Sequence, residues 1–339
     1  MQYRRMGRTG LKVSELCLGT MTFGHGTDQA EANRIVDLAF AAGVNFFDTA
    51  NAYGNGQSEV LLGEALKGRR RDVIVATKVF NPMGPNPNDS GMSRVHILRA
   101  IEDSLTRLQT DYVDIYYIHH VDEQTPLEEM LRAFDDLVHQ GKVRYIACSN
   151  YEAWRLLEAV WISETKSLAR FECYQPQYSL VVRDIEEEII PVCQLKELGV
   201  VVWSPLAGGF LSGKYQPGEQ QVAGTRSEEG WAYPRRYFAP NADDSLGVLL
   251  EVAQEMGRSP AQVAVRWLLD QPAVTSAIVG ARTGEQAQDN FKAAGWQLPA
   301  EALARLNQVS VLPPRYPKSM EYNMHERRNQ AVKMPSLKD

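Results

Sequence analysis

The chain of 339 residues has 44% hydrophobic and 23% charged residues, which is the composition of an ordinary globular protein. Its formal net charge of −6 argues against nucleic acid as a main partner, because phosphate-binding proteins carry a basic surface. The sequence has no apolar run of about 18 residues and no apolar signal-peptide core near its start, so we expect a cytoplasmic protein with no membrane partner.

Short runs rich in β-branched and aromatic residues alternate with longer segments of helical period along nearly the whole chain. Glycines at 43, 141, 199 and 257 stand where helices should end, and Ser93 and Ser259-Pro260 stand where helices should begin. Eight strands are predicted, at residues 13–19, 45–49, 73–78, 113–119, 143–149, 170–175, 200–204 and 275–279. Helices are predicted at residues 29–42, 58–66, 94–108, 127–140, 153–163, 185–198, 245–256, 261–269 and 284–294.

The predicted strands are apolar on both faces, which is typical of parallel strands covered by helices. Eight strand–helix units favour a closed (β/α)₈ barrel in one domain, at about residues 7–309, with a tail at 310–339. A doubly wound open sheet is the alternative, but no G-x-G-x-x-G follows the first strand. The irregular segment 207–244 is an insertion after the seventh strand, and we expect the tail to wrap a barrel end.

Four polar residues stand at or just after the ends of three consecutive predicted strands: Asp48, Tyr53, Lys78 and His119. Parallel strands end at the same edge of a barrel, so these side chains should meet there. A lysine ammonium beside a tyrosine stabilises the phenolate, and an aspartate holds that lysine charged, while a histidine can donate to a substrate carbonyl oxygen. Such a group can polarise a carbonyl while a nicotinamide cofactor delivers hydride, because no side chain carries one.

Each of these residues also has a structural interpretation when it is taken alone. An aspartate or tyrosine in a loop often caps or packs, and a lysine at a strand end is often solvated. His119 and His120 are adjacent, but no third metal ligand lies at a useful offset, so no metal site is expected. The four cysteines lack metal-ligand spacing and are expected to be small buried side chains in a reducing compartment.

The chain resembles the aldo-keto reductases over almost its whole length, from Gly7 to about Val309. The residues that carry the resemblance are the opening GRTGLKVS segment and the tetrad Asp48, Tyr53, Lys78 and His119. The resemblance implies a (β/α)₈ fold and hydride transfer between NADP(H) and aldehydes or ketones. It also implies that Tyr53 is the general acid in reduction and the general base in oxidation.

Further positions match the cofactor site of that family. The resemblance implies a carboxamide contact after the fifth and sixth strands, an aromatic that stacks on the nicotinamide, a belt over the pyrophosphate and an adenosine site near residue 282. The implied cofactor residues are Gly19, Thr20, Met21, Asp48, Ser149, Asn150, Gln175, Trp203, Ser204, Pro205, Leu206, Gly208, Lys214, Arg226, Gly280, Arg282, Gln286 and Asn290.

Two of these positions carry particular weight and also have simpler explanations. Trp203 matches the stacking aromatic, although packing at the barrel mouth would also explain it. Arg282 is placed to pair with a 2′-phosphate, which favours NADP over NAD, although it could be an ordinary exposed arginine.

The sequence departs from the family pattern beside the tetrad, where His120 and Val121 stand in place of the usual Trp-Pro or Arg-Pro. Met21, Phe23 and the tail after residue 312 are expected to line the substrate pocket, and the loop 81–91 to form a rim. The identity of the small-molecule substrate, the direction of reaction and the oligomeric state have no sequence signal. Two other functions remain open: a regulatory subunit similar to the potassium-channel β subunits, and a lyase or isomerase that uses no nicotinamide.

Overall fold

The computed structural model describes residues 1–219, 222, 238–320 and 324, and the centre of this part is a closed barrel of eight parallel strands. Each barrel strand pairs with the next along the chain, and the last pairs with the first. This confirms the predicted (β/α)₈ barrel and excludes the open sheet. The barrel strands are β3 (Leu16–Gly19), β4 (Phe46–Asp48), β5 (Ile74–Val79), β6 (Val113–Ile118), β7 (Val143–Ser149), β8 (Phe171–Gln175), β9 (Gly199–Val202) and β10 (Ser276–Gly280).

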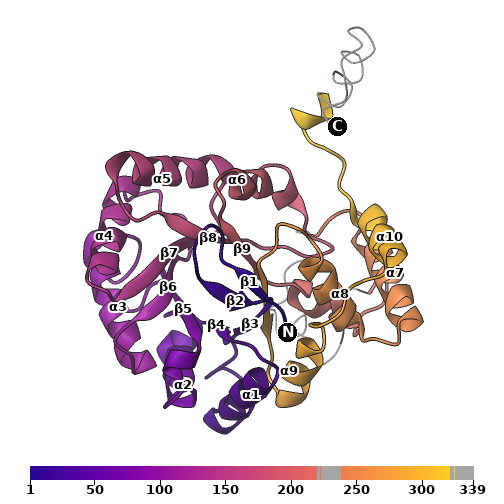
Figure 1. Ribbon diagram of the computed structural model, residues 1–339, viewed down its shortest axis with the longest axis horizontal. Helices are drawn as coiled ribbons and strands as arrows, with labels where there is room; N and C mark the ends of the chain where they lie inside the picture. The colour runs from indigo at the N-terminus through magenta and orange to yellow at the C-terminus, as the bar shows by residue number, and fades with distance from the viewer. Residues whose placement is uncertain (220–221, 223–237, 321–323, 325–339) are drawn as a thin grey trace.

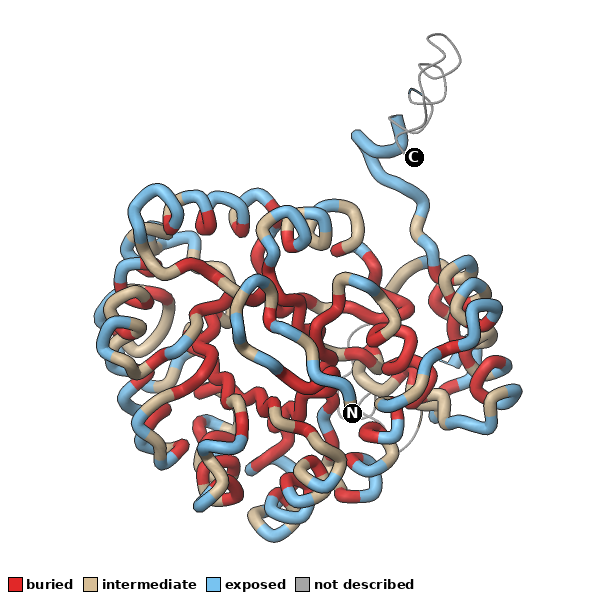
Figure 2. Tube along the Cα trace, viewed as in Figure 1, coloured by how far each residue is buried: buried red, intermediate tan, exposed pale blue. Residues whose placement is uncertain are grey.

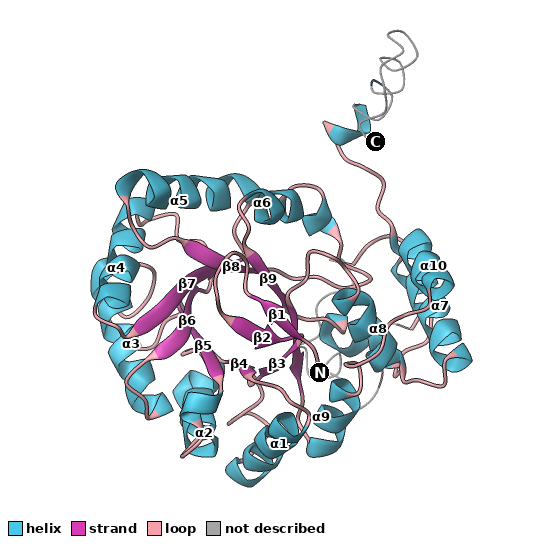
Figure 3. Ribbon diagram, in the orientation of Figure 1, coloured by secondary structure: helices cyan, strands magenta, loops and turns pink. Residues whose placement is uncertain are grey.

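Helices surround the barrel, and most of them connect one strand to the next (Figures 1 and 3). Most of them bury one face and expose the other, so red backbone lies mainly inward and pale blue backbone mainly outward in Figure 2. Residues 261–269 are the exception, because all of them are buried. On one helix the buried stripe includes Ile97, Ile101 and Leu105. The helices are α1 (Gln29–Ala41), α2 (Gln57–Ala65), α3 (Arg94–Leu108), α4 (Leu127–His139), α5 (Ala153–Lys166), α6 (Ile189–Leu195), α7 (Ala242–Glu255), α8 (Pro260–Leu269), α9 (Gly284–Phe291) and α10 (Ala300–Ser310).

The inside of the barrel is a second apolar core, separate from the layer between strands and helices. This explains why the strands are apolar on both faces, since one face packs inward and the other packs against helices. The four cysteines are free and buried, and Cys17 and Cys173 belong to this inner core. Each barrel strand contributes to it, through Cys17, Phe46, Ala76, Ile115, Tyr117, Ala147, Cys173, Val201 and Ile278.

A β-hairpin at the start of the chain packs against the N-terminal end of the barrel. Its strands are β1 (Tyr3–Arg5) and β2 (Lys12–Ser14), so the single strand predicted at residues 13–19 is wrong and consists of β2 and β3. The interruption is Glu15, whose buried carboxylate accepts hydrogen bonds from the backbone amides of Gln2 and Gly295. These bonds hold Glu15 at the point where the chain passes from the hairpin into the first barrel strand.

The predicted helix end at Gly199 is also wrong. Gly199 is the first residue of β9, and the left-handed residue after α6 is Glu197, with φ of 52°. A Cβ at residue 199 would lie 2.3 Å from the sulfur of Met6 and 3.1 Å from the backbone nitrogen of Gly7, so glycine lets the hairpin pack closely against β9. The other three predicted helix ends are confirmed by positive φ at residues 43, 141 and 257, and Ser93 and Ser259 do cap α3 and α8.

The helix predicted at residues 185–198 is broken. A 3₁₀ turn, η3 (Asp184–Glu186), precedes the shorter α6. Pro191 stands in the first turn of α6 and lacks the amide hydrogen that would bond to a preceding turn, so the helix cannot extend further back.

The C-terminal part departs from the prediction in two ways. Helix α10, which packs against α7, was not predicted. The tail at 312–320 leads away from the barrel in Figure 1, and Arg315 pairs with Asp184 in the loop after β8. No residue of 312–320 lines the substrate pocket, so the predicted contribution of the tail to that pocket is wrong for these residues. Among the helices of the described residues, none has the length and apolar character to cross a membrane.

Candidate active site

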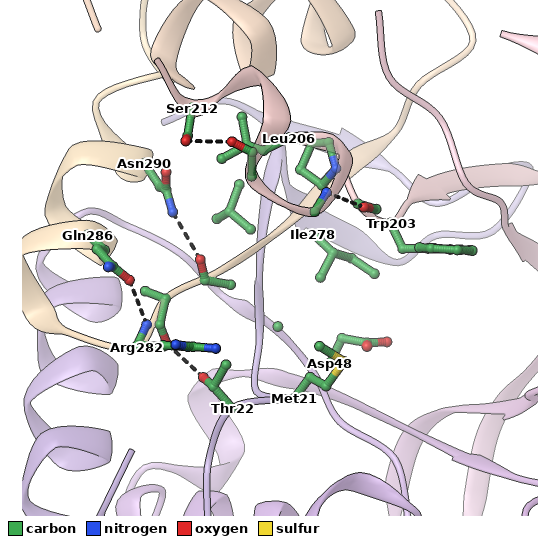
Figure 4. Close-up of a pocket in the computed structure, with 18 of the residues that line it drawn as sticks. Met21, Thr22, Asp48, Trp203, Leu206, Ser212, Ile278, Arg282, Gln286 and Asn290 are labelled. Carbon is green, nitrogen blue, oxygen red and sulfur yellow. Dashed lines mark hydrogen bonds between the residues drawn. The ribbon is translucent and has the colours of Figure 1, made fainter. Parts of the chain in front are cut away.

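A cleft of about 740 Å³ opens at the C-terminal ends of the barrel strands, a size that suits a small molecule. Figure 4 shows part of it, with Asp48 and Met21 toward one side and Gln286 and Asn290 toward the other. The cleft brings together residues that are far apart in the sequence. The predicted site residues that line it are Gly19, Met21, Asp48, Tyr53, His119, Ser149, Asn150, Gln175, Trp203, Ser204, Pro205, Leu206, Gly208, Lys214, Gly280, Arg282, Gln286 and Asn290.

Two of the predicted site residues that the structure describes do not line the cleft. Lys78 lies behind it, in contact with the lining residues Asp48 and Tyr53. Thr20 is fully buried, and its hydroxyl donates to the backbone oxygen of Asp48 at 3.1 Å, so it supports the end of β4. Arg226 falls outside the described residues. Phe23, which was expected in the substrate pocket, is instead part of the buried core.

The tyrosine reaches the cleft through a tight turn after β4. The 3₁₀ segment η1 (Tyr53–Gly56) begins at Tyr53, and Gly54, Asn55 and Gly56 all have positive φ. Two glycines and an asparagine are the residues that adopt this conformation at least cost. The turn therefore returns the Tyr53 side chain toward the end of the strand that carries Asp48.

Lys78 is fully buried and makes three polar contacts. Its ammonium donates to a carboxylate oxygen of Asp48, to the backbone oxygen of Thr49 at 2.9 Å and to the Tyr53 hydroxyl at 3.3 Å. Burial by itself lowers the pKa of Lys78, but the charge of Asp48 and the contact with Tyr53 outweigh it, and the pKa is raised. Lys78 is therefore a cation at neutral pH, next to the phenol.

The pKa of Tyr53 is raised rather than lowered, which differs from the expected effect of the lysine. Desolvation at the barrel mouth is the largest cause, and Asp48 adds to it, while Lys78 acts in the opposite direction. The phenol therefore keeps its proton at neutral pH. Lys78 remains placed to stabilise the phenolate once that proton leaves.

His119 follows β6 and faces Tyr53, with ring centroids 5.8 Å apart in an edge-to-face arrangement. Its other side stacks on His120 at 4.5 Å. Desolvation, followed by the charge of Lys78 and by His120, lowers the pKa of His119 to about 2. The imidazole is therefore neutral at physiological pH and has one N–H to donate.

The second carboxylate oxygen of Asp48 accepts a hydrogen bond from the side-chain amide of Gln175 at 2.8 Å. Ser149 donates to the backbone oxygen of Gln175 at 2.7 Å. The side chain of Asn150 donates to the backbone oxygen of His119 at 3.1 Å and accepts from the indole of Trp203 at 3.3 Å. The residues predicted for the carboxamide thus form one network with the tetrad.

The loop after β9 supplies the middle of the cleft. It enters the 3₁₀ segment η4 (Ala207–Ser212), where Gly208 and Gly209 have positive φ, and Ser204 has φ of 56°. The Ser204 hydroxyl accepts from the amide of Gly208 at 3.2 Å and stabilises this turn. The prediction missed Gly209 and Ser212, although both lie within the glycine-rich stretch that it had placed at a pyrophosphate.

The far part of the cleft lies between β10 and α9. Gln286 accepts from the backbone amide of Arg282 at 2.9 Å, and Asn290 donates to the backbone oxygen of Gly280 at 3.1 Å (Figure 4). Glu285 and Asp289 also line the cleft and were missed, although helical spacing places them next to Gln286 and Asn290. The other lining residues that were not predicted as site residues are Thr22, His120, Ala261, Ile278, Val279 and Ala281.

A search for a metal site found no suitable group. Within residues 1–219, 222, 238–320 and 324, no three histidine, cysteine, aspartate or glutamate side chains gather closely enough to hold an ion. The polar groups at the cleft include hydroxyls, amides, two imidazoles, the carboxylates of Asp48, Glu285 and Asp289, and the cations of Lys214 and Arg282.

Comparison with known proteins gives consistent results over the whole barrel. A model of the Aldo/keto reductase family matches residues 15–311. A Bacillus subtilis (strain 168) protein described as the uncharacterized oxidoreductase YrpG is 42% identical over 91% of this chain and 96% of its own length. A probable voltage-gated potassium channel subunit beta of Arabidopsis thaliana is 36% identical over 94% of this chain and 99% of its own, and one from Oryza sativa subsp. japonica is 38% identical over 86% and 91%.

Proposed function

The chain belongs to the aldo/keto reductase family of oxidoreductases, and on that basis we propose that it interconverts aldehydes or ketones and alcohols with NADP(H). The observation that carries the proposal is the contact between the Tyr53 hydroxyl and the Lys78 ammonium, 3.3 Å apart at the floor of a cleft of ligand size. A purely structural role would rarely require a protonated phenol and a buried cation to lie together beside an accessible cleft.

The residues of this chain suit a bound nicotinamide dinucleotide. Hydroxyl and amide groups of Ser149, Asn150 and Gln175 lie at the Tyr53 end, where a carboxamide needs both donors and acceptors. The backbone at Gly209 has φ of 103°, and a Cβ there would meet nothing within 4 Å, so a phosphate group can approach the backbone closely at this point. Lys214 and Arg282 also line the cleft and offer cations to phosphate groups, and Arg282 is the proposed partner of a 2′-phosphate.

When bound, the nicotinamide supplies the hydride that no side chain can carry. In reduction, Tyr53 gives its proton to the carbonyl oxygen, and Lys78 stabilises the phenolate that forms. Asp48 keeps Lys78 charged and in place, and His119 orients the carbonyl oxygen by donating a hydrogen bond. In oxidation the phenolate takes the alcohol proton back, so the rate of oxidation rises with pH because the pKa of Tyr53 is raised.

The test is a screen of aldehydes, ketones, quinones and secondary alcohols with NADPH or NADP⁺, applied to the wild type and to Tyr53→Phe. Removing the phenolic proton should lower kcat by about 10²- to 10⁴-fold and leave NADPH binding, measured by Trp fluorescence, unchanged. The matched control is Tyr117→Phe, because the Tyr117 ring also lies near Lys78, at 5.9 Å, but its hydroxyl bonds to Cys173 inside the barrel. Full activity of Tyr53→Phe would disprove the acid role.

A regulatory subunit is the second candidate function. It is favoured by the relatives named as probable potassium channel β subunits and by two exposed indoles on α5, Trp154 at 58% and Trp161 at 61% exposure. The same screen separates the candidates. Tight NADPH binding without turnover of any carbonyl in the panel favours the regulatory subunit, whereas steady consumption of NADPH favours the enzyme.

A further inference from the structure

The imidazole of His119 is held by an asparagine outside the tetrad. The side-chain nitrogen of Asn81, in the loop after β5, lies 3.2 Å from Nδ1 of His119. The backbone amide of His119 donates to the oxygen of Val79 at 3.0 Å, and its carbonyl oxygen accepts from Asn150. The residue is therefore fixed at its backbone and at one ring nitrogen.

The orientation of the ring is fixed as well. His120 stacks on His119 with an angle of only 12° between the ring planes, and Phe80 contacts the His120 ring at 5.4 Å. Tyr53 also contacts the His119 ring, edge to face at 5.8 Å. A half-turn of the imidazole would put Cδ2 in the place of Nδ1 and Cε1 in the place of Nε2, and it would lose the Asn81 contact.

The proton positions on the ring follow from the chemistry of the partner. An amide nitrogen donates hydrogen bonds and does not accept them. With the Asn81 amide nitrogen facing Nδ1, as the structure places it, Nδ1 is the acceptor. A neutral imidazole carries one hydrogen, and that hydrogen is then on Nε2. Because His119 lines the cleft and Asn81 does not, Nε2 is the nitrogen left for a ligand in the cleft.

We propose that Asn81 is a positioning residue that selects the Nε2–H tautomer of His119 and thereby makes it a hydrogen-bond donor to the substrate oxygen. The second half of this statement rests on the proposed carbonyl chemistry, whereas the tautomer itself does not. The wrong tautomer would present a lone pair to the oxygen lone pairs of the substrate and repel them. Asn81 thus decides whether the imidazole assists catalysis or opposes it.

The experiment uses ¹⁵N spectroscopy of the histidine rings in the full-length protein, with the His119 signals assigned by their loss in His119→Gln. The wild type should show an unprotonated Nδ1 and a protonated Nε2. In Asn81→Asp, the new carboxylate can only accept, so Nδ1 should carry a proton. Asn88→Asp, an exposed change of the same charge in the same loop, should leave the His119 signals unchanged.

The kinetic signature of Asn81→Asp is a new pH dependence. Where His119 is neutral with its hydrogen on Nδ1, the Nε2 donor is lost, and kcat for reduction should fall by about 10²-fold, as for the loss of one positioned donor. At lower pH the ring takes a second proton, Nε2–H returns and kcat recovers, in a region where the wild type is flat. The charged and titratable groups around the ring are Lys78, His120 and Tyr53, and all three are unchanged in the variant.

Two results would overturn the proposal: a protonated Nδ1 in the wild type, or an Asn81→Asp variant whose Nδ1 stays unprotonated. A protonated Nδ1 with wild-type kcat at every pH would overturn the donor role. If Asn81→Asp does not fold, Asn81→Leu serves as the second variant. Its side chain can neither donate nor accept a hydrogen bond, so His119 should show a mixture of the two tautomers. If the wild type has the Nε2–H tautomer and reduces no carbonyl, the proposed function fails while the tautomer assignment stands.

Discussion

The barrel contains a buried carboxylate–cation pair at each of its two ends. At the C-terminal end, Asp48 pairs with Lys78, and at the N-terminal end Glu15 pairs with Arg266 at 3.2 Å. All four residues are at most 2% exposed. By burial and charge alone the two pairs look equally suited to chemistry, so the difference between them lies in their surroundings.

The N-terminal pair is closed on all sides by groups of the protein. Glu15 accepts from Arg4 at 3.4 Å in addition to Arg266 and two backbone amides, and Arg4 bonds to the backbone oxygens of Leu269 and Val274. These contacts join the hairpin to α8 and to the last strand of the barrel. The pair holds segments together and has no neighbour whose proton could be transferred.

The C-terminal pair contacts a hydroxyl group whose proton can be transferred, and it borders the cleft. Lys78 donates to the Tyr53 hydroxyl, and both Tyr53 and Asp48 line the cleft. A buried ion pair costs desolvation wherever it lies, and its presence is weak evidence for function. The comparison indicates that the third, protonated group and the access from the cleft are the features that distinguish a candidate active site.

Breaking the C-terminal pair should have the largest effect on activity. In Lys78→Met the phenolate of Tyr53 loses its stabilising cation, so kcat for carbonyl reduction should fall by about 10²- to 10⁴-fold. The remaining carboxylate of Asp48 keeps only the Gln175 amide, and stability should fall by about 3–5 kcal/mol. Urea unfolding and steady-state kinetics per folded molecule measure the two effects separately, and unchanged kcat would contradict the role of the cation.

Breaking the N-terminal pair should lower stability less and leave the chemistry intact. Glu15→Gln leaves Arg266 and Arg4 without their shared carboxylate, but Arg266 keeps Asp270 at 2.9 Å. Stability should therefore fall by about 2–3 kcal/mol, while kcat per folded molecule stays at the wild-type value. The control is Glu251→Gln, which removes an exposed partner of Arg305 and should change stability by no more than about 1 kcal/mol. A large loss of kcat in Glu15→Gln would show that the two ends are coupled.

The sequence predicted the two ends of the barrel unequally. Asp48, Lys78 and His119 were identified because each stands where an apolar run stops, and that signal is local. Glu15 was absorbed into a predicted strand, because its partner Arg266 is 251 positions away and nothing in the local pattern indicates the pair. Periodicity locates strands and helices, whereas contacts between distant segments have to be seen in three dimensions.

The chemistry was also only partly predictable. Residue types indicated that Lys78 would act on Tyr53, but the net direction of the Tyr53 pKa depends on desolvation, which the sequence does not report. Asn81 was predicted only as part of a flexible rim, since the contact of a loop asparagine with a ring nitrogen has no periodic pattern. The missed Glu285 and Asp289 had a usable signal, because they stand on the same helix as two residues that were identified.

The smallest expected effect concerns the charge state of His119. Lys78 helps to lower the pKa of this histidine, and the N-terminal pair has no such neighbour. The unfolded chain protonates this histidine below about pH 6.5, whereas its pKa in the folded protein is about 2. Between these values the unfolded state binds one more proton, so stability falls as the pH falls, by up to about 1.4 kcal/mol per pH unit. Urea unfolding at pH 7 and pH 5 should therefore show a smaller loss in His119→Gln than in the wild type, by up to about 2 kcal/mol. His139→Gln, on the exposed face of α4, is the matched control, and equal losses in the wild type and His119→Gln would mean that the folded protein carries His119 as a cation.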